Sequence, residues 1–111
     1  MDRDEQLRQI AYFEAILDEL TRLSADPESG APALRAAEGR AKELEAYYTG
    51  ADWKRDFADD EAGLLPKELR RGVLSEDGIW DALESYRARL AACGEQKSRL
   101  RRLWDRLRGR A

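Results

Sequence analysis

Residues 47–80 read YYTGADWKRDFADDEAGLLPKELRRGVLSEDGIW, and this stretch separates the helical patterns on either side of it. Its apolar residues are scattered among charges, glycines and a proline, so they follow neither the period of a helix nor that of a strand. They are also too numerous for a disordered linker. Irregular connections of this length are uncommon in small domains and tend to be functional. We therefore predict a structured loop with short helical turns, and we expect the functional surface to include it.

Amphipathic helices are predicted on both sides of this stretch. Apolar residues at helical spacing indicate a first helix over residues 4–23, which the sequence SADPESGAP at residues 24–32 ends. A second helix is predicted from about Pro32 to about Tyr48, because proline suits the first turn of a helix. Ser75 is a suitable N-cap for a third helix, since two acidic residues follow it in the first turn.

These helices predict an all-α fold, an antiparallel three-helix bundle with the structured loop between its second and third helices. Residues 1–94 are the predicted bundle domain, and residues 95–111 form a basic amphipathic C-terminal extension. Gly94 stands at the boundary and is a candidate bend or end of the third helix. The predicted core consists of residues from the three apolar stripes: Leu17, Leu20, Leu34, Leu44, Tyr48, Leu83, Tyr86 and Leu90.

The net charge of this 111-residue chain is −3, and it is unevenly distributed. The C-terminal extension holds seven basic and two acidic side chains, a net +5, so the remaining residues carry −8. In a helix that continues past the bundle, the apolar stripe of the extension would lie in water, so we expect it to fold back, dimerise or bind a partner. This stripe consists of Leu100, Leu103, Trp104 and Leu107.

Several kinds of chemistry are missing from the sequence. The chain has no histidine, which removes the commonest general base and a favoured zinc ligand. There is no glycine-rich phosphate-binding motif, and the acids between Asp56 and Glu61 lack the glycine of an EF-hand loop. Cys93 falls on the apolar stripe of the third helix and is interpreted as a core thiol. We therefore predict a non-catalytic protein without a cofactor or metal. Its lone cysteine and the absence of a long apolar run favour the cytoplasm.

The aromatic residues of the central stretch stand at a definite spacing. Tyr47 and Tyr48 are followed by Trp53 and Asp56 in the pattern YY–x4–W–x2–D, and LPKELRRGVLSED follows at residues 65–77. These two blocks resemble the bacterial domain-of-unknown-function family 4298, over roughly the first 94 residues. The resemblance implies a small helical bacterial protein and implies no activity. It marks the following signature positions: Tyr47, Tyr48, Trp53, Asp56, Arg71, Gly72, Ser75, Glu76 and Asp77.

The aromatic residues Tyr47, Tyr48, Trp53 and Trp80 form a cluster that is expected to pack in or against the core of the bundle. Trp53 is expected to close one end of it, and Asp56 to bond either to the Trp53 indole or to a tyrosine hydroxyl. Trp80 is expected to pack in the core at the start of the third helix. Because aromatic residues also dominate binding hot spots, a partner contact through Trp53 is the alternative to core packing.

The charged residues of the stretch have two interpretations. Arg70-Arg71-Gly72 before a helix resembles an anion-binding layout, but Glu76 and Asp77 would repel an anion there. The simpler prediction is that Arg70 or Arg71 pairs with Glu76 or with the acids of residues 56–61. The loop would then be ordered by its own charges.

From these observations we expect a protein–protein interaction or accessory module that self-associates through the C-terminal extension. One alternative is a nucleic-acid-associated regulator that uses the arginine-rich extension. Another is a small-ligand or cation sensor at the acidic loop, centred on Asp56, Asp59, Asp60 and Asp77. The expected partner is another protein, a second copy included, and no membrane span is expected. The candidate partner-binding residues are Tyr47, Trp53, Asp56, Arg70, Arg71, Leu100, Leu103, Trp104 and Leu107.

Overall fold

The computed structural model describes the backbone of residues 2–108 and the side chains of residues 2–93. Within this range the chain is helical and contains no strand, which confirms the all-α prediction. Its elements in chain order are α1 (Arg3–Ala25), α2 (Ala31–Ala36), α3 (Glu38–Tyr48), α4 (Ala51–Glu61), the 3₁₀ turn η1 (Gly72–Leu74) and α5 (Gly78–Arg108).

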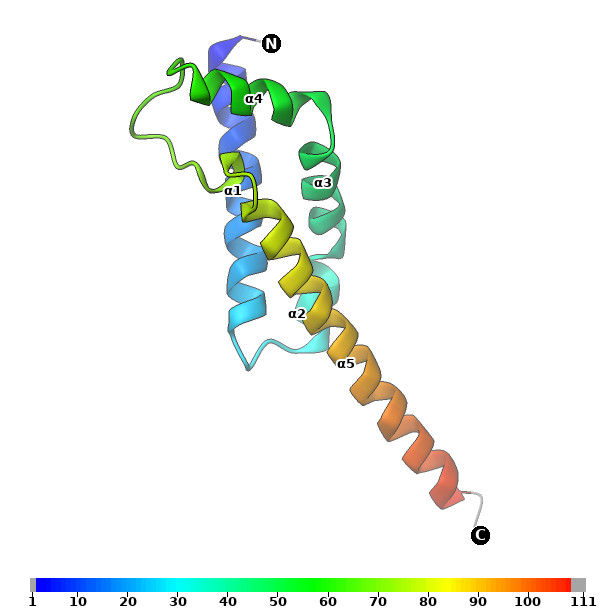
Figure 1. Cartoon of the computed structure of the whole chain (residues 1–111). Coiled ribbons are helices and arrows are strands. Elements are labelled where there is room, and N and C mark those ends of the chain that lie inside the picture. The colour runs from blue at the N-terminus through cyan, green and yellow to red at the C-terminus, as the bar shows by residue number, and fades with distance from the viewer. Residues whose placement is uncertain (1, 109–111) are drawn as a thin grey trace.

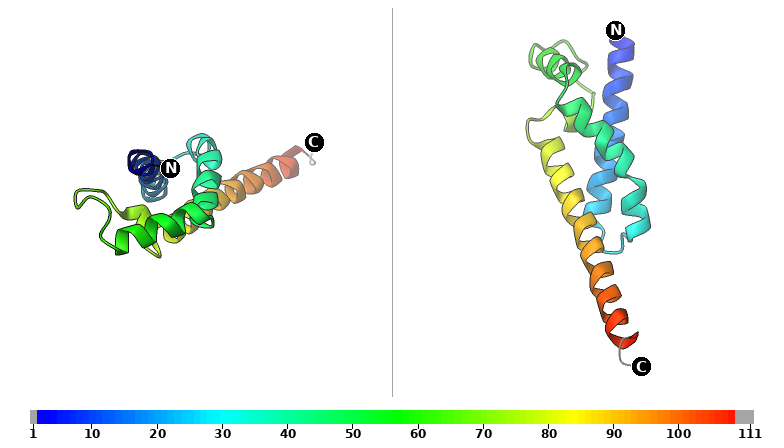
Figure 2. Two further views of the ribbon diagram at one scale, coloured as in Figure 1. Left: turned by 90° about the horizontal axis from the view of Figure 1, so that it is seen from above. Right: turned by 90° about the vertical axis from the view of Figure 1, so that its right-hand side faces the viewer.

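The helices form an elongated molecule of 69 × 23 × 20 Å (Figure 1). Helix α1 runs from one end of the body to the other, and α2 and α3 run back antiparallel to it (Figures 1 and 2). The first half of α5 packs against α1, α2 and α3, while α4 crosses the end of the body where α1 begins. No helix of the described residues is both long and apolar enough to cross a membrane.

Helix α1 closely matches its predicted bounds, and its ends show why. The carboxylate of Asp2 is the N-cap and accepts a hydrogen bond of 2.7 Å from the backbone N–H of Glu5. Asp4 and Glu5 place negative charge in the first turn, where the helix dipole favours it. The helix ends at Ala25, two residues before Pro27, which cannot continue it.

The single second helix that the sequence predicted is divided into α2 and α3 at Ala37. The hydroxyl of Tyr86, on α5, donates a hydrogen bond to the backbone carbonyl of Leu34. In a continuous α-helix this carbonyl would accept from the N–H of Glu38. The break between α2 and α3 therefore lies where a backbone carbonyl of the helix accepts a hydrogen bond from a side chain of another helix. Leu34 and Ala37 are both fully buried beside it.

The prediction of a loop throughout the central stretch is wrong for residues 51–61, which form the three-turn helix α4. The inward-facing position of this helix is Asp56, whose side chain is fully buried. Because an aspartate stands at the position where an apolar residue is expected, Trp53 and Phe57 do not form a recognisable apolar stripe at helical spacing. The remainder, residues 62–77, is irregular apart from η1, as predicted.

The hydrophobic core contains six of the eight residues predicted for it. Tyr48 and Leu90 are only partly buried and pack against its edge. Tyr47 is buried in place of Tyr48, and its ring stacks on that of Phe13 with 4.1 Å between ring centroids. The prediction that Trp80 packs in the core is wrong, because its side chain is 57% exposed. In α5, the neighbouring Ile79 faces inward instead.

Helix α5 is continuous through Gly94, so this glycine does not end the helix. Its second half extends beyond the other helices and carries the C-terminal end away from them (Figure 1). The C-terminal extension is therefore helical up to Arg108. The side chains of its predicted apolar stripe, Leu100, Leu103, Trp104 and Leu107, lie outside the described residues.

Gly72 is expected to be sensitive to substitution because α1 approaches it closely. A Cβ atom at this position would stand 2.6 Å from Glu14 Oε1 and 2.9 Å from Leu17 Cδ2, and both side chains are buried. We expect Gly72→Ala to lower the free energy of unfolding by about 1–3 kcal/mol through overpacking. The control is Gly39→Ala in α3, where a Cβ would meet no atom within 4 Å. This control is expected to raise the free energy of unfolding, measured with urea, by about 0.5–1 kcal/mol. Equal effects of the two variants would contradict this explanation.

Candidate functional site

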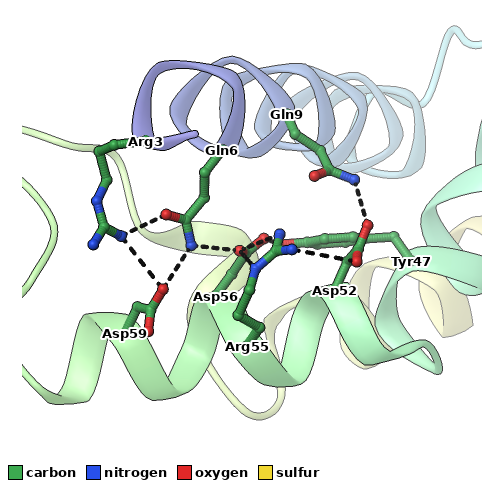
Figure 3. Close-up of polar contacts among 8 residues, drawn as sticks. All are labelled: Arg3, Gln6, Gln9, Tyr47, Asp52, Arg55, Asp56 and Asp59. Atoms are coloured by element: carbon green, nitrogen blue, oxygen red, sulfur yellow. Dashed lines mark hydrogen bonds and ion pairs between the residues drawn. The ribbon is translucent and has the colours of Figure 1, made fainter. Parts of the chain in front are cut away.

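The carboxylate of Asp56 is the centre of a polar network that joins three helices (Figure 3). Its Oδ2 atom accepts a hydrogen bond of 2.6 Å from the hydroxyl of Tyr47 on α3. Its Oδ1 atom accepts from Gln6 Nε2 on α1 at 2.8 Å and from Arg55 Nη2 at 2.9 Å. The prediction that Asp56 bonds to a tyrosine hydroxyl is confirmed. A buried carboxylate with these donors on both oxygens is well satisfied.

Further polar contacts extend this network along the seam between α1 and α4 (Figure 3). The Gln6 amide also donates to Asp59 Oδ2 at 2.9 Å, and Arg3 Nη1 contacts the same oxygen at 3.3 Å. At the other end, Gln9 Nε2 donates to Asp52 Oδ2 at 3.0 Å. The seam between these two helices is thus largely polar.

Electrostatics fix the protonation of two members of the network. Burial, followed by the hydrogen bond to Asp56, raises the pKa of Tyr47 well above its ordinary value of 10.0. The pKa of Asp59 is lowered, chiefly by the hydrogen bond from Gln6 and also by Arg3, although desolvation opposes this. Tyr47 therefore keeps its proton and donates it in a hydrogen bond. At neutral pH the network is therefore held together by a protonated Tyr47 and an ionised Asp59.

The backbone of η1 is held by side chains from two helices. Glu14 of α1, which is 6% exposed, accepts a 2.9 Å hydrogen bond from the N–H of Val73 through Oε2. Trp53 of α4 donates from its indole Nε1 to the Val73 carbonyl at 2.7 Å. Trp53 is partly buried and stacks on Phe57. It closes this end of the body by binding the turn.

Arg71 orders the loop before η1. Its Nε donates to Asp60 Oδ1 at 2.7 Å, which confirms the predicted pairing of this loop with the acids of residues 56–61. The rest of its guanidinium donates to backbone carbonyls of the loop, those of Pro66, Lys67 and Leu69. Arg70 instead extends to α1, where it pairs with Asp18 at 2.7 Å and remains 69% exposed.

Ser75 makes the contact predicted for an N-cap, although α5 begins three residues later. Its Oγ accepts from the N–H of Gly78 at 3.0 Å and donates to the carbonyl of Gly72 at 3.0 Å. The hydroxyl of Tyr48 donates to the carbonyl of Glu76 at 2.9 Å, which ties α3 to the same turn. The side chains of Glu76 and Asp77 are exposed.

The structure thus distributes the predicted partner-binding residues among different environments. Tyr47 and Asp56 are buried together, and Trp53 and Arg71 are partly buried in contacts that hold the loop. Arg70 is exposed beside α1. Within the described residues, no group of three cysteine, aspartate or glutamate side chains is placed to hold a metal ion. Asp59 and Asp60 face Arg3 and Arg71.

A groove between α1, α3 and α4 was not predicted from the sequence. It has a volume of about 520 Å³ and a largely apolar floor that includes the stacked rings of Phe13 and Tyr47. Glu43 and Asp52 stand among its lining residues, and we name it the acid-rimmed groove. Its lining comes from Gln9, Phe13, Glu43, Ala46, Tyr47, Gly50, Ala51 and Asp52. Because three helices contribute, no local pattern in the sequence marks it.

A family model described as a domain of unknown function, DUF4298, matches residues 10–93. The chain is a small helical protein in which the polar network and loop contacts hold a cap, residues 51–77, across one end of the body. It belongs to the DUF4298 family, as its signature residues indicated. No curated protein and no solved structure matches the chain. The match runs from Ile10 within α1 to the first half of α5, and it leaves out the C-terminal extension.

Removal of the central carboxylate is expected to destabilise the protein strongly. Asp56→Ala would leave the Tyr47 hydroxyl and the Gln6 amide without this acceptor in a buried site. We expect a loss of about 2–4 kcal/mol in the free energy of unfolding, measured with urea. Asp59→Ala removes a more exposed acceptor of the same amide and is expected to lose only a small fraction of that. Similar losses in both variants would show that Asp56 is not the centre of the network.

The raised pKa of Tyr47 predicts a loss of stability in alkali. The folded state binds this proton more tightly than the unfolded state, so the stabilisation is complete below pH 10.0 and declines as the pH rises above it. Tyr47→Phe is expected to cost about 1 kcal/mol at neutral pH and to flatten the decline above pH 10. Urea unfolding midpoints across this range provide the measurement. Tyr48→Phe, which leaves Tyr47 in place, is the control, and an equally flattened profile there would contradict the assignment.

Proposed function

We propose that this chain is a non-catalytic protein–protein interaction module that self-associates through its C-terminal extension, residues 95–111. The observation that carries the proposal is the continuity of α5 from Gly78 to Arg108. An unbroken helix carries the backbone of the extension away from the other helices of the body (Figure 1). The apolar stripe predicted for such a segment is typical of an interaction site.

The energy for such a contact comes from the apolar stripe of the extension. Burial of each large side chain from water contributes about 1.5–3 kcal/mol when it is fully covered. The extension contains three leucines and a tryptophan, the residue type most enriched in binding hot spots. Its net charge of +5 adds a preference for an acidic surface.

The polar network supports a non-catalytic role, because its groups are engaged in the fold. The carboxylate of Asp56 and the hydroxyl of Tyr47 are hydrogen-bonded to each other and buried. Of the predicted partner-binding residues in the described part of the chain, a second protein could reach the exposed guanidinium of Arg70 and the partly exposed Trp53. We further propose a bacterial cytoplasmic protein, in line with the family resemblance and the single cysteine.

The charge of the extension also favours one competing function, the binding of nucleic acid by a regulator. Phosphate contacts would make that binding fall steeply with salt concentration. Contact through an apolar stripe responds much less to salt. A cation sensor at the acidic residues of α4 has less support, since Asp56, Asp59 and Asp60 all face amide, hydroxyl or basic donors.

Truncation tests the proposed function. Deletion of residues 95–111 is expected to leave the body folded, because the hydrophobic core found among the described side chains lies within residues 10–86. Far-ultraviolet circular dichroism should then show a cooperative melt. In sedimentation equilibrium the full chain should self-associate while the truncated chain stays monomeric. A full chain that is monomeric at all concentrations, or a truncated chain that still associates, would contradict the proposal.

A further inference from the structure

We propose that the acid-rimmed groove binds the C-terminal extension of a second copy of this chain. The inference rests on the self-association proposed above and assigns the surface that receives the extension. Two properties define a suitable surface. It must offer apolar contact for leucine and tryptophan side chains, and it must carry negative charge against a segment of net charge +5.

The acid-rimmed groove has both properties. Phe13 and Tyr47 form a stacked aromatic pair in its floor, and Ala46 and Ala51 line it with small side chains that leave room for larger ones. Its charged lining residues, Glu43 and Asp52, are both acidic. Ala46 and Glu43 are exposed, so the groove is open to a partner. The volume of about 520 Å³ accommodates several side chains of an incoming helix.

Two other hollows in the described part of the chain fit the extension less well. The hollow between α1 and α5 is lined mainly by small residues, with Asp81 as its single charge. The hollow on α5 beside Trp80 holds one acid, Glu84, and one base, Arg87, so it carries no net negative charge to attract the basic extension. Arg87 also forms an ion pair with Glu45 of α3. Charge and apolar character therefore coincide best in the acid-rimmed groove.

The continuity of α5 makes the occupant a second copy. The groove lies where α1, α3 and α4 meet, near the end of the body where α1 begins. Helix α5 carries the extension beyond the opposite end (Figures 1 and 2). An unbroken helix cannot bend its last turns back across the length of the body, so a chain cannot fill its own groove. Pairing of two extensions would instead bring two segments of net charge +5 together.

Charge reversal at the rim of the groove tests this assignment in the full-length chain. Glu43→Arg replaces an exposed rim acid with a base, and Ala46→Arg places bulk and positive charge in the groove at a second exposed helical position. Each is expected to raise the self-association Kd by about tenfold or more in sedimentation equilibrium. Glu61→Arg makes the same change of charge at an exposed position in the last turn of α4. This control is expected to change the Kd less than about twofold.

A reciprocal variant identifies the two surfaces as partners. Arg101→Glu with Arg102→Glu in the extension is expected to weaken self-association, and combination with Glu43→Arg to restore part of it. Circular dichroism melts establish that every variant is folded. Association that persists in folded Glu43→Arg and Ala46→Arg variants, or that weakens equally in Glu61→Arg, would overturn the groove as the binding surface and leave self-association intact. A monomeric wild-type chain would overturn both proposals.

Discussion

The buried carboxylate of Asp56 is the constraint on which the cap of this protein depends. A charge removed from water is tolerated only where hydrogen bonds and opposite charge replace its hydration. Here the donors come from Gln6 on α1, from Tyr47 on α3 and from Arg55 of its own helix, so the carboxylate is satisfied only when α1, α3 and α4 are all in place. Because α4 has few apolar residues, this polar network, with Trp53 and Phe57, determines where the helix lies.

The same logic extends to the irregular segment between α4 and α5. An irregular backbone lacks the regular hydrogen bonds of a helix, so its N–H and C=O groups need partners from side chains. Glu14 and Trp53 bind the two polar groups of Val73, and Arg71 donates to three loop carbonyls. The signature residues through which the chain resembles its family are thus largely those that order its cap. The architecture of this end of the body therefore gives most of the signature residues a structural role.

The sequence predicts those parts of the fold in which the apolar residues at helical spacing are also the residues that face the core. The stripes of α1 and α5 face the core, so both helices and most of the core could be found from spacing alone. Helix α4 was missed because its inward position holds an aspartate whose partners lie on helices distant in sequence. The division of the second helix at Ala37 depends on the hydroxyl of Tyr86, about 50 residues away, which no local window contains. The acid-rimmed groove was missed for the same reason, since it exists only after three helices have packed.

Charge in this chain is separated along a single rigid element. The body carries −8 and the C-terminal extension +5, and α5 belongs to both, since its first half supplies core residues and its second half the extension. A flexible linker would let the two charges meet within one molecule at a high effective concentration. A continuous helix that cannot span the distance back to the groove reduces that effective concentration to near zero. In the proposed self-association, neutralisation takes place between molecules and depends on protein concentration. Under the proposed self-association, the continuity of α5 through Gly94 directs the basic extension toward a second molecule rather than toward the acidic body of its own chain.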